Sequence, residues 1–293
     1  MKEYEKLFTK RNMKLGGVSA LLTGEPGCGK SNAMVRIATK ESKNDILVWR
    51  MKNSCQWSIF THTKCKLIFH LKEGLEYNLF NKYRGTKTKF GGYGRVKRWK
   101  SPENLLFNLE PGCINVVQTL PYSAKSNAQQ RAFVREWIEI FDVFLWRKSM
   151  TPISIFFDET EDLCPLGKTG FHHTNTQVTD LLKEMRKTRI NFFAATQRAT
   201  ELHWTLLNKI QWMIYMRGAK PRAGSSVYVK RLGKLKTGYS VIEGTTFESF
   251  KFNFVGQDKY LLCDVKIPED KLEEFTKEDE KEREIQLMKS LKL

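Results

Sequence analysis

The chain has 293 residues, of which 41% are hydrophobic. This apolar fraction can form a substantial core, which excludes a disordered chain and favours one large α/β domain over residues 1–293. The six cysteines are scattered without Cys-x2-Cys pairs, and no apolar run approaches the roughly 20 residues of a membrane span. A disulfide-stabilised secreted domain and a direct membrane span are therefore excluded, and we expect a cytoplasmic protein.

The charge is strongly positive and unevenly distributed. The formal net charge is +18, but residues 269–284 hold nine acids and four bases, so the rest of the chain carries +23. An excess of this size predicts a polyanionic partner. We favour nucleic acid over an anionic membrane surface or general solubility.

A glycine-rich loop follows the first predicted strand, residues 18–23. Residues 24–31, GEPGCGKS, fit the pattern Gly-x4-Gly-Lys-Ser/Thr and precede a predicted helix over 32–40. In this pattern backbone N–H groups bind phosphates at a helix N-terminus, the lysine reaches the β- and γ-phosphates, and the serine hydroxyl ligates Mg²⁺. The alternative is an ordinary glycine-rich turn, but such a turn does not require a strand directly before it and a helix directly after it. We predict nucleotide binding by Gly24, Glu25, Pro26, Gly27, Cys28, Gly29, Lys30, Ser31 and Asn32.

Residues 45–49 predict a second parallel strand, and residues 52–111 predict a basic insertion with a strand at 66–71. Residues 82–100 hold eight bases, no acid and four interleaved aromatic residues. Basic side chains bind phosphates and aromatic rings stack on bases, so we expect a flexible nucleic-acid-binding arm. The alternative is a hairpin whose aromatic residues fold onto its own sheet. The predicted DNA-binding residues are Lys87, Lys89, Arg95, Lys97 and Arg98.

The sheet resumes at residues 113–118, and apolar residues spaced near 3.6 predict a core-facing helix over 129–148. The next strand, residues 153–159, ends in Asp158 and Glu159. At a strand tip beside a phosphate loop, one acid holds Mg²⁺ through its water shell and a second polarises the attacking water. We therefore predict Ser31 and Asp158 as the magnesium residues and Glu159 as catalytic.

The remaining elements are a loop containing His172 and His173, a helix over 177–188, and a strand over 190–196 that ends at Gln197. An amide at this strand tip would contact the γ-phosphate. A strand over 212–217 follows. The alternation of residues 239–244 and 247–254 predicts antiparallel edge strands. A charged C-terminal segment, 269–293, predicts a helix.

Three segments together resemble the second half of the FtsK/HerA-type DNA-translocating ATPases. They are the helix segment 181–187 with its Arg-Lys pair, the strand ending Ala195-Thr196-Gln197-Arg198, and Leu206-Leu207-Asn208 before a strand ending in Arg217. With the phosphate loop and the Asp-Glu strand, the likeness covers about residues 15–50 and 113–255. Residues 52–111 lie outside it.

The resemblance implies a RecA-like P-loop core, a hexameric homo-oligomeric ring with ATP and Mg²⁺ at its interfaces, and hydrolysis that drives double-stranded DNA through the pore. It implies that Lys30, Ser31, Asp158 and Glu159 form the ATP site and that Gln197 senses the γ-phosphate. A trans arginine would stabilise developing charge. Arg186 and Arg217 both fit that role.

One departure from the family is Met185, where a glycine is usual. The chain also lacks the β-barrel, membrane anchor and winged-helix parts of cellular members. It is therefore most similar to genome-packaging ATPases of tailless, membrane-containing viruses or to ATPases of archaeal mobile elements. Viral packaging would add capsid or membrane proteins as partners and would place the chain in the host cytoplasm or the virion.

Two other functions remain open. An AAA+ remodelling ATPase shares the phosphate loop and the Asp-Glu strand, but it should end in a small helical lid rather than in β-hairpins. A DNA-binding structural or regulatory protein could use ATP only to set its conformation. Glu159 distinguishes a translocase from such a regulator, because only a protein that hydrolyses ATP needs a catalytic carboxylate at this position.

Overall fold

The computed structural model describes residues 16–41, 45–147, 151–167, 171–222, 224–225, 227, 229–243, 249–251 and 261–291. A ten-stranded sheet has the order β12-β11-β10-β1-β9-β8-β2-β7-β3-β6, and it is parallel from β10 to β6. This confirms the mostly parallel α/β fold. The strands are β1 (Ser19–Thr23), β2 (Ile46–Arg50), β3 (Lys66–Lys72), β6 (Arg95–Trp99), β7 (Cys113–Gln118), β8 (Ile153–Asp158), β9 (Ile190–Thr196), β10 (Trp212–Met216), β11 (Tyr239–Glu243) and β12 (Ser249–Lys251).

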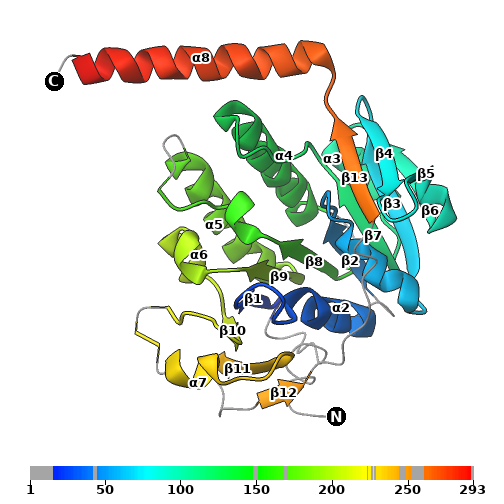
Figure 1. The fold of residues 1–293 in the computed structure, drawn as a ribbon, viewed down its shortest axis with the longest axis vertical. Coiled ribbons are helices and arrows are strands. Elements are labelled where there is room, and N and C mark those ends of the chain that lie inside the picture. Colours follow the sequence, from blue (N-terminus) through cyan, green and yellow to red (C-terminus); the bar gives the residue numbers. More distant parts are fainter. Residues whose placement is uncertain are drawn as a thin grey trace.

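Both faces of the sheet are covered, because the parallel strands are apolar on both sides. Adjacent residues of β8 show this: Phe156 packs with the cluster that contains α2, and Phe157 with the cluster that contains α4. One face carries α2 (Lys30–Glu41) and the 3-10 helix η1 (Gln56–His62). The other carries α3 (Pro102–Asn108), α4 (Asn127–Leu145), α5 (His172–Lys187) and α6 (Trp204–Leu207) (Figure 1).

Residues 52–111 are more closely joined to the core than we predicted, because two of their strands belong to the main sheet. Strands β3 and β6 lengthen the parallel sheet beyond β7, while β4 (Glu76–Asn81), β5 (Thr86–Thr88) and β13 (Leu261–Lys266) form a second, antiparallel sheet. Three of the four aromatic residues in the basic run pack inward. Phe90 and Tyr93 contact the Trp57 ring, and Trp99 is fully buried, whereas Tyr83 is 78% exposed.

The C-terminal end of the chain differs in character from the core. Strands β11 and β12 pair antiparallel as predicted, although residues 244–248 and 252–260 lie outside the described part. Helix α8 (Glu269–Leu291) runs across the end of α4 (Figure 1). Asp279 accepts a hydrogen bond from the backbone N–H of Ala128 at 2.8 Å, and Glu282 pairs with Arg131 at 2.8 Å.

The fold also corrects the expected loop at His172 and His173, and the expected N-terminal helix falls outside the described residues. His172 and His173 are not in a loop, because α5 begins at His172 and both are in its first turn. The polar and basic sequence of residues 1–17 predicts an entry helix before the turn at Gly16-Gly17, and its first 15 residues lie outside the described residues. Among the described helices, none is long and apolar enough to cross a membrane.

The core can be tested at Trp137, which is fully buried and lies 5.1 Å from the Phe157 ring. Trp137→Ala should lower the free energy of unfolding by about 3–5 kcal/mol, because it leaves a cavity between α4 and β8. The matched control is Trp146→Ala, since Trp146 follows the same helix but is 80% exposed. It should change the free energy by less than about 0.5 kcal/mol. Equal denaturant midpoints for the two variants would contradict this packing.

Candidate functional site: a phosphate loop beside an acidic turn

The phosphate loop leaves β1 at the carboxyl edge of the sheet and ends in the first turn of α2. Gly27 and Gly29 have φ values of +76° and +105°, which L side chains rarely adopt. A Cβ at Gly24 would lie 2.8 Å from the Cys28 sulfur and 3.0 Å from the Arg217 carbonyl oxygen. The glycines are therefore required by the backbone path, which turns the loop back over the strand.

Lys30, Ser31 and Asp158 meet at this loop. The Lys30 Nζ donates to the carbonyl oxygens of Gly24 and Glu25 at 2.8 and 3.1 Å. The Ser31 hydroxyl donates to Asp158 Oδ2 at 3.2 Å, and Asp158 Oδ1 accepts from the Glu159 N–H at 3.0 Å. A hydroxyl and a buried carboxylate at this separation fit Mg²⁺, which prefers oxygen ligands and keeps several waters.

Gln197 lies at the same edge because of the strand register. Thr196 is the partner of Thr23 in the parallel pair β1–β9, so Gln197 and Gly24 are the next residues on adjacent strands. The Gln197 backbone therefore lies beside the start of the phosphate loop. Its side chain is exposed.

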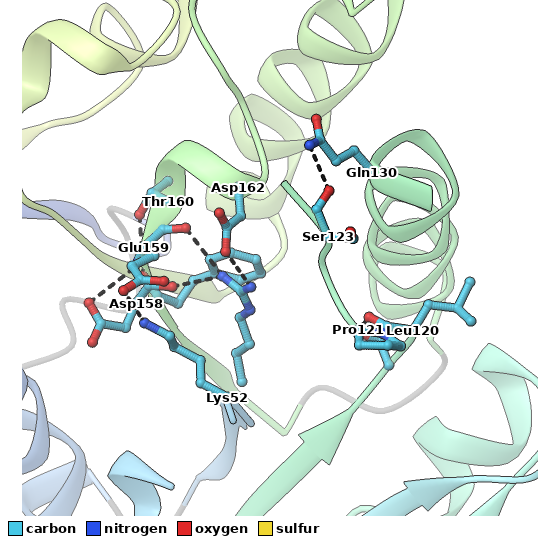
Figure 2. A network of polar contacts seen from close by, with 12 residues as sticks. Lys52, Leu120, Pro121, Ser123, Gln130, Asp158, Glu159, Thr160 and Asp162 are labelled. Carbon is cyan, nitrogen blue, oxygen red and sulfur yellow. Dashed lines mark hydrogen bonds and ion pairs between the residues drawn. The ribbon is translucent and has the colours of Figure 1, made fainter. Parts of the chain in front are cut away.

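Arg50 organises the acidic turn that follows β8. Its guanidinium donates to the carbonyl oxygens of Asp158 and Glu159 at 2.8 and 3.2 Å and to Asp162 Oδ2 at 2.5 Å. Figure 2 labels the three accepting residues. The group is buried and lies over the rings of Phe133 and Phe157, at 4.7 and 4.6 Å from their centroids. Burying a charged guanidinium is costly, and here the three oxygen acceptors and the two aromatic rings offset that cost.

Glu159 adopts an unusual backbone conformation and contacts a lysine. Its φ of 55° is in the left-handed region, which is uncommon for a residue other than glycine and is often found at functional sites. Its carboxylate pairs with the Lys52 ammonium, just beyond the end of β2 (Figure 2). Both residues line a cavity of about 270 Å³ that Gln118 and Tyr122 also line.

Glu161 was not predicted as a site residue. Burial raises the pKa of its carboxyl to about 7, and the nearby charges of Asp162 and Glu159 add to the rise, whereas hydrogen bonds from its own backbone and from Thr196 oppose it. Burial likewise raises the pKa of Asp162 despite Arg50. The signal was present in the sequence, because DETED places four acids within five residues, and such crowding predicts perturbed ionisation.

The two predicted trans arginines lie at different edges. Arg217 follows β10 at the carboxyl edge, where it pairs with Glu25 of its own phosphate loop and donates to Thr237 Oγ1 at 2.9 Å. The Arg217 guanidinium is therefore held by its own loop in this chain, and its trans role stays a prediction. Arg186 ends α5 at the amino edge, where its carbonyl accepts from the Gly17 N–H. Its Nε is buried without a hydrogen-bond partner among the described residues.

No protein-family model matches the chain, and no curated protein does. The solved structures that are similar to it include the following three proteins. VirB4 of Thermoanaerobacter pseudethanolicus has a TM-score of 0.55 and 12% identity over 84% of this chain and 92% of that one. The bacterial conjugative coupling protein TrwB has a TM-score of 0.52 and 10% identity, over 87% of this chain and 92% of that one.

The genome packaging NTPase B204 of Sulfolobus turreted icosahedral virus 2, in complex with ATP-γS, has a TM-score of 0.50 and 10% identity over 82% of this chain and 98% of that one. The fold is that of a RecA-like P-loop NTPase. The fold expected from the FtsK/HerA resemblance is therefore confirmed, and identities this low carry no more than the fold.

The buried ion pair of Arg50 and Asp162 can be tested by removing one partner or both. Arg50→Met should lower the free energy of unfolding by about 3–5 kcal/mol, because it leaves the Asp162 carboxylate buried without its cation. The double variant Arg50→Met with Asp162→Leu should recover part of that loss. Chemical denaturation measures all three proteins, and a double variant no more stable than the single one would contradict the pair.

Glu161 makes a pH-dependent prediction. Its carboxyl holds its proton up to about pH 7 in the folded chain, against an ordinary pKa of 4.5. Between these values only the unfolded chain loses the proton, so the free energy of unfolding should fall as the pH rises. Glu161→Gln removes this dependence. It should be more stable than the wild type by roughly 1–3 kcal/mol above pH 7 and equal below pH 4.5. A stability difference between Glu161→Gln and the wild type that does not change with pH would contradict the raised pKa of Glu161.

Proposed function

We propose that this chain is an ATP-driven DNA translocase that moves or packages double-stranded DNA. The observation that carries the proposal is the meeting of Lys30, Ser31 and Asp158 at one sheet edge, with the hydroxyl and carboxylate 3.2 Å apart. Its support is the fold shared with VirB4, TrwB and the packaging NTPase B204. The net charge of +18 supports a polyanionic partner.

Each residue at the edge has a role in the proposed hydrolysis. The loop N–H groups and Lys30 bind the phosphates of ATP, and Ser31 and Asp158 hold Mg²⁺, which neutralises phosphate charge. Glu159 orients and deprotonates the attacking water, and Gln197 contacts the γ-phosphate. Because the Lys52 ammonium pairs with Glu159, this carboxylate must exchange that partner for the water before it can act as a base.

The working assembly we propose is a hexameric ring with nucleotide at the subunit interfaces. Arg186 and Arg217 both remain candidates for the trans arginine, and Arg217 would have to leave Glu25 to reach a neighbouring subunit. A viral genome-packaging role, with capsid or membrane proteins as partners, is the more specific form of the proposal. The likeness to the packaging NTPase B204 supports it through the fold alone. The competing function is a DNA-binding regulator that binds ATP without hydrolysing it.

Glu159→Gln tests the proposal against that regulator. DNA-stimulated ATP turnover should fall by roughly 10²–10⁴-fold, because an amide cannot accept the proton of the attacking water. ATP binding, measured by fluorescence of a labelled analogue, should persist. The matched control is Glu161→Gln, the same substitution two residues along the same turn, which should keep turnover within a few-fold.

Three outcomes would contradict part of this assignment. Unchanged turnover in Glu159→Gln would remove the catalytic role of Glu159. A decrease confined to Glu161→Gln would move that role to Glu161. A wild-type chain that binds ATP and DNA but never hydrolyses ATP would favour the regulator.

A further inference from the structure

Seven of the eight bases of the 82–100 run divide into two groups in the folded chain, and the eighth, Lys100, is exposed outside both groups. Lys97 pairs with Glu110 at 2.8 Å, Arg95 pairs with the same carboxylate, and Arg98 lies over the Tyr77 ring at 5.2 Å. These three side chains are therefore held by the protein. They are the weaker part of the predicted DNA-binding set.

The second group lies on the β4–β5 hairpin. Six consecutive residues, 82–87, are exposed, and so is Lys89. The turn is defined by a hydrogen bond from the Arg84 N–H to Asn81 Oδ1 at 3.1 Å and by Gly85, whose φ is +62°. Within the described residues, no ion pair involves Lys82, Arg84, Lys87 or Lys89, so four positive charges are presented together on one projecting hairpin.

The acids of the C-terminal helix lie away from this hairpin turn. In the β4–β13 pair, Leu261 is opposite Asn81 at the turn, whereas Lys266 is opposite Glu76 at the other end. Helix α8, with its nine acids, begins three residues after Lys266. The register of the second sheet thus separates the acidic helix from the basic turn by the length of β4.

We propose that this hairpin surface binds the phosphate backbone of duplex DNA. The surface, named here the hairpin site, consists of Lys82, Tyr83, Arg84, Lys87 and Lys89. Lysine and arginine neutralise phosphates without reading sequence, and Tyr83, which is 78% exposed as a residue, adds a side chain of a type that also contacts phosphates. The inference deepens the proposed function and rests on it for the identity of the ligand.

The test compares two triple variants that remove the same charge. Lys82→Ala, Arg84→Ala and Lys87→Ala alter the hairpin site, and Arg95→Gln, Lys97→Gln and Arg98→Gln alter the held group. Binding of a labelled duplex is measured by fluorescence anisotropy without nucleotide, at several salt concentrations. The slope of log affinity against log salt decreases in magnitude by about 0.9 for each phosphate that the protein no longer neutralises.

The hairpin variant should bind the duplex roughly tenfold or more weakly and with a slope smaller by about two to three, whereas the held-group variant should stay within about threefold of the wild-type affinity. Equal weakening in both variants, or weakening in the held-group variant alone, would overturn the hairpin site. So would a hairpin variant that keeps duplex binding but no longer binds vesicles of anionic phospholipid. Thermal unfolding midpoints confirm that each variant is folded.

Failure of the hairpin site can be distinguished from failure of the proposed function. Because binding is measured without nucleotide, a chain that hydrolyses no ATP can still show the hairpin site. Conversely, DNA-stimulated turnover that persists in the hairpin variant, together with unchanged duplex affinity, would leave the translocase standing and remove the site.

Discussion

The Arg50 guanidinium determines the shape of the candidate site. Its donors bind two consecutive carbonyl oxygens and the Asp162 carboxylate, so the chain must turn sharply directly after β8. Because of that turn, the Asp158 carboxylate contacts Ser31 and the Glu159 carboxylate contacts Lys52. Removing the Arg50 guanidinium from water costs several kcal/mol. Its position over the Phe133 and Phe157 rings offsets part of this cost.

Much of the core could be predicted from sequence because its signals are local. Strands β7 and β9 occupy the predicted residues, since each is a short apolar run bounded by polar residues. Parallel strands place their carboxyl ends at one edge, so residues after β1, β8 and β9 had to gather there. Helix α5 starts earlier than predicted, because its first turn is polar and carries no apolar period.

Other features depend on contacts between distant residues. The apolar residues of β3 fit a strand, but nothing local indicates that it pairs with β7 rather than standing apart. The basic run offered aromatic residues for stacking on bases, yet Trp99 donates instead to the carbonyls of His70 and Gln118. Likewise, the pairing of Arg217 with Glu25 depends on β10 lying beside β1.

The pairing of β13 with β4 has a consequence for how the chain is made. Residues 76–81 have no partner from residues 261–266 until all the residues between these two strands have been synthesised. The phosphate loop and the acidic turn come from earlier segments and can assemble before it. Completion of the second sheet therefore follows assembly of the nucleotide pocket, and a nascent chain would acquire that pocket before it acquires a fully supported hairpin.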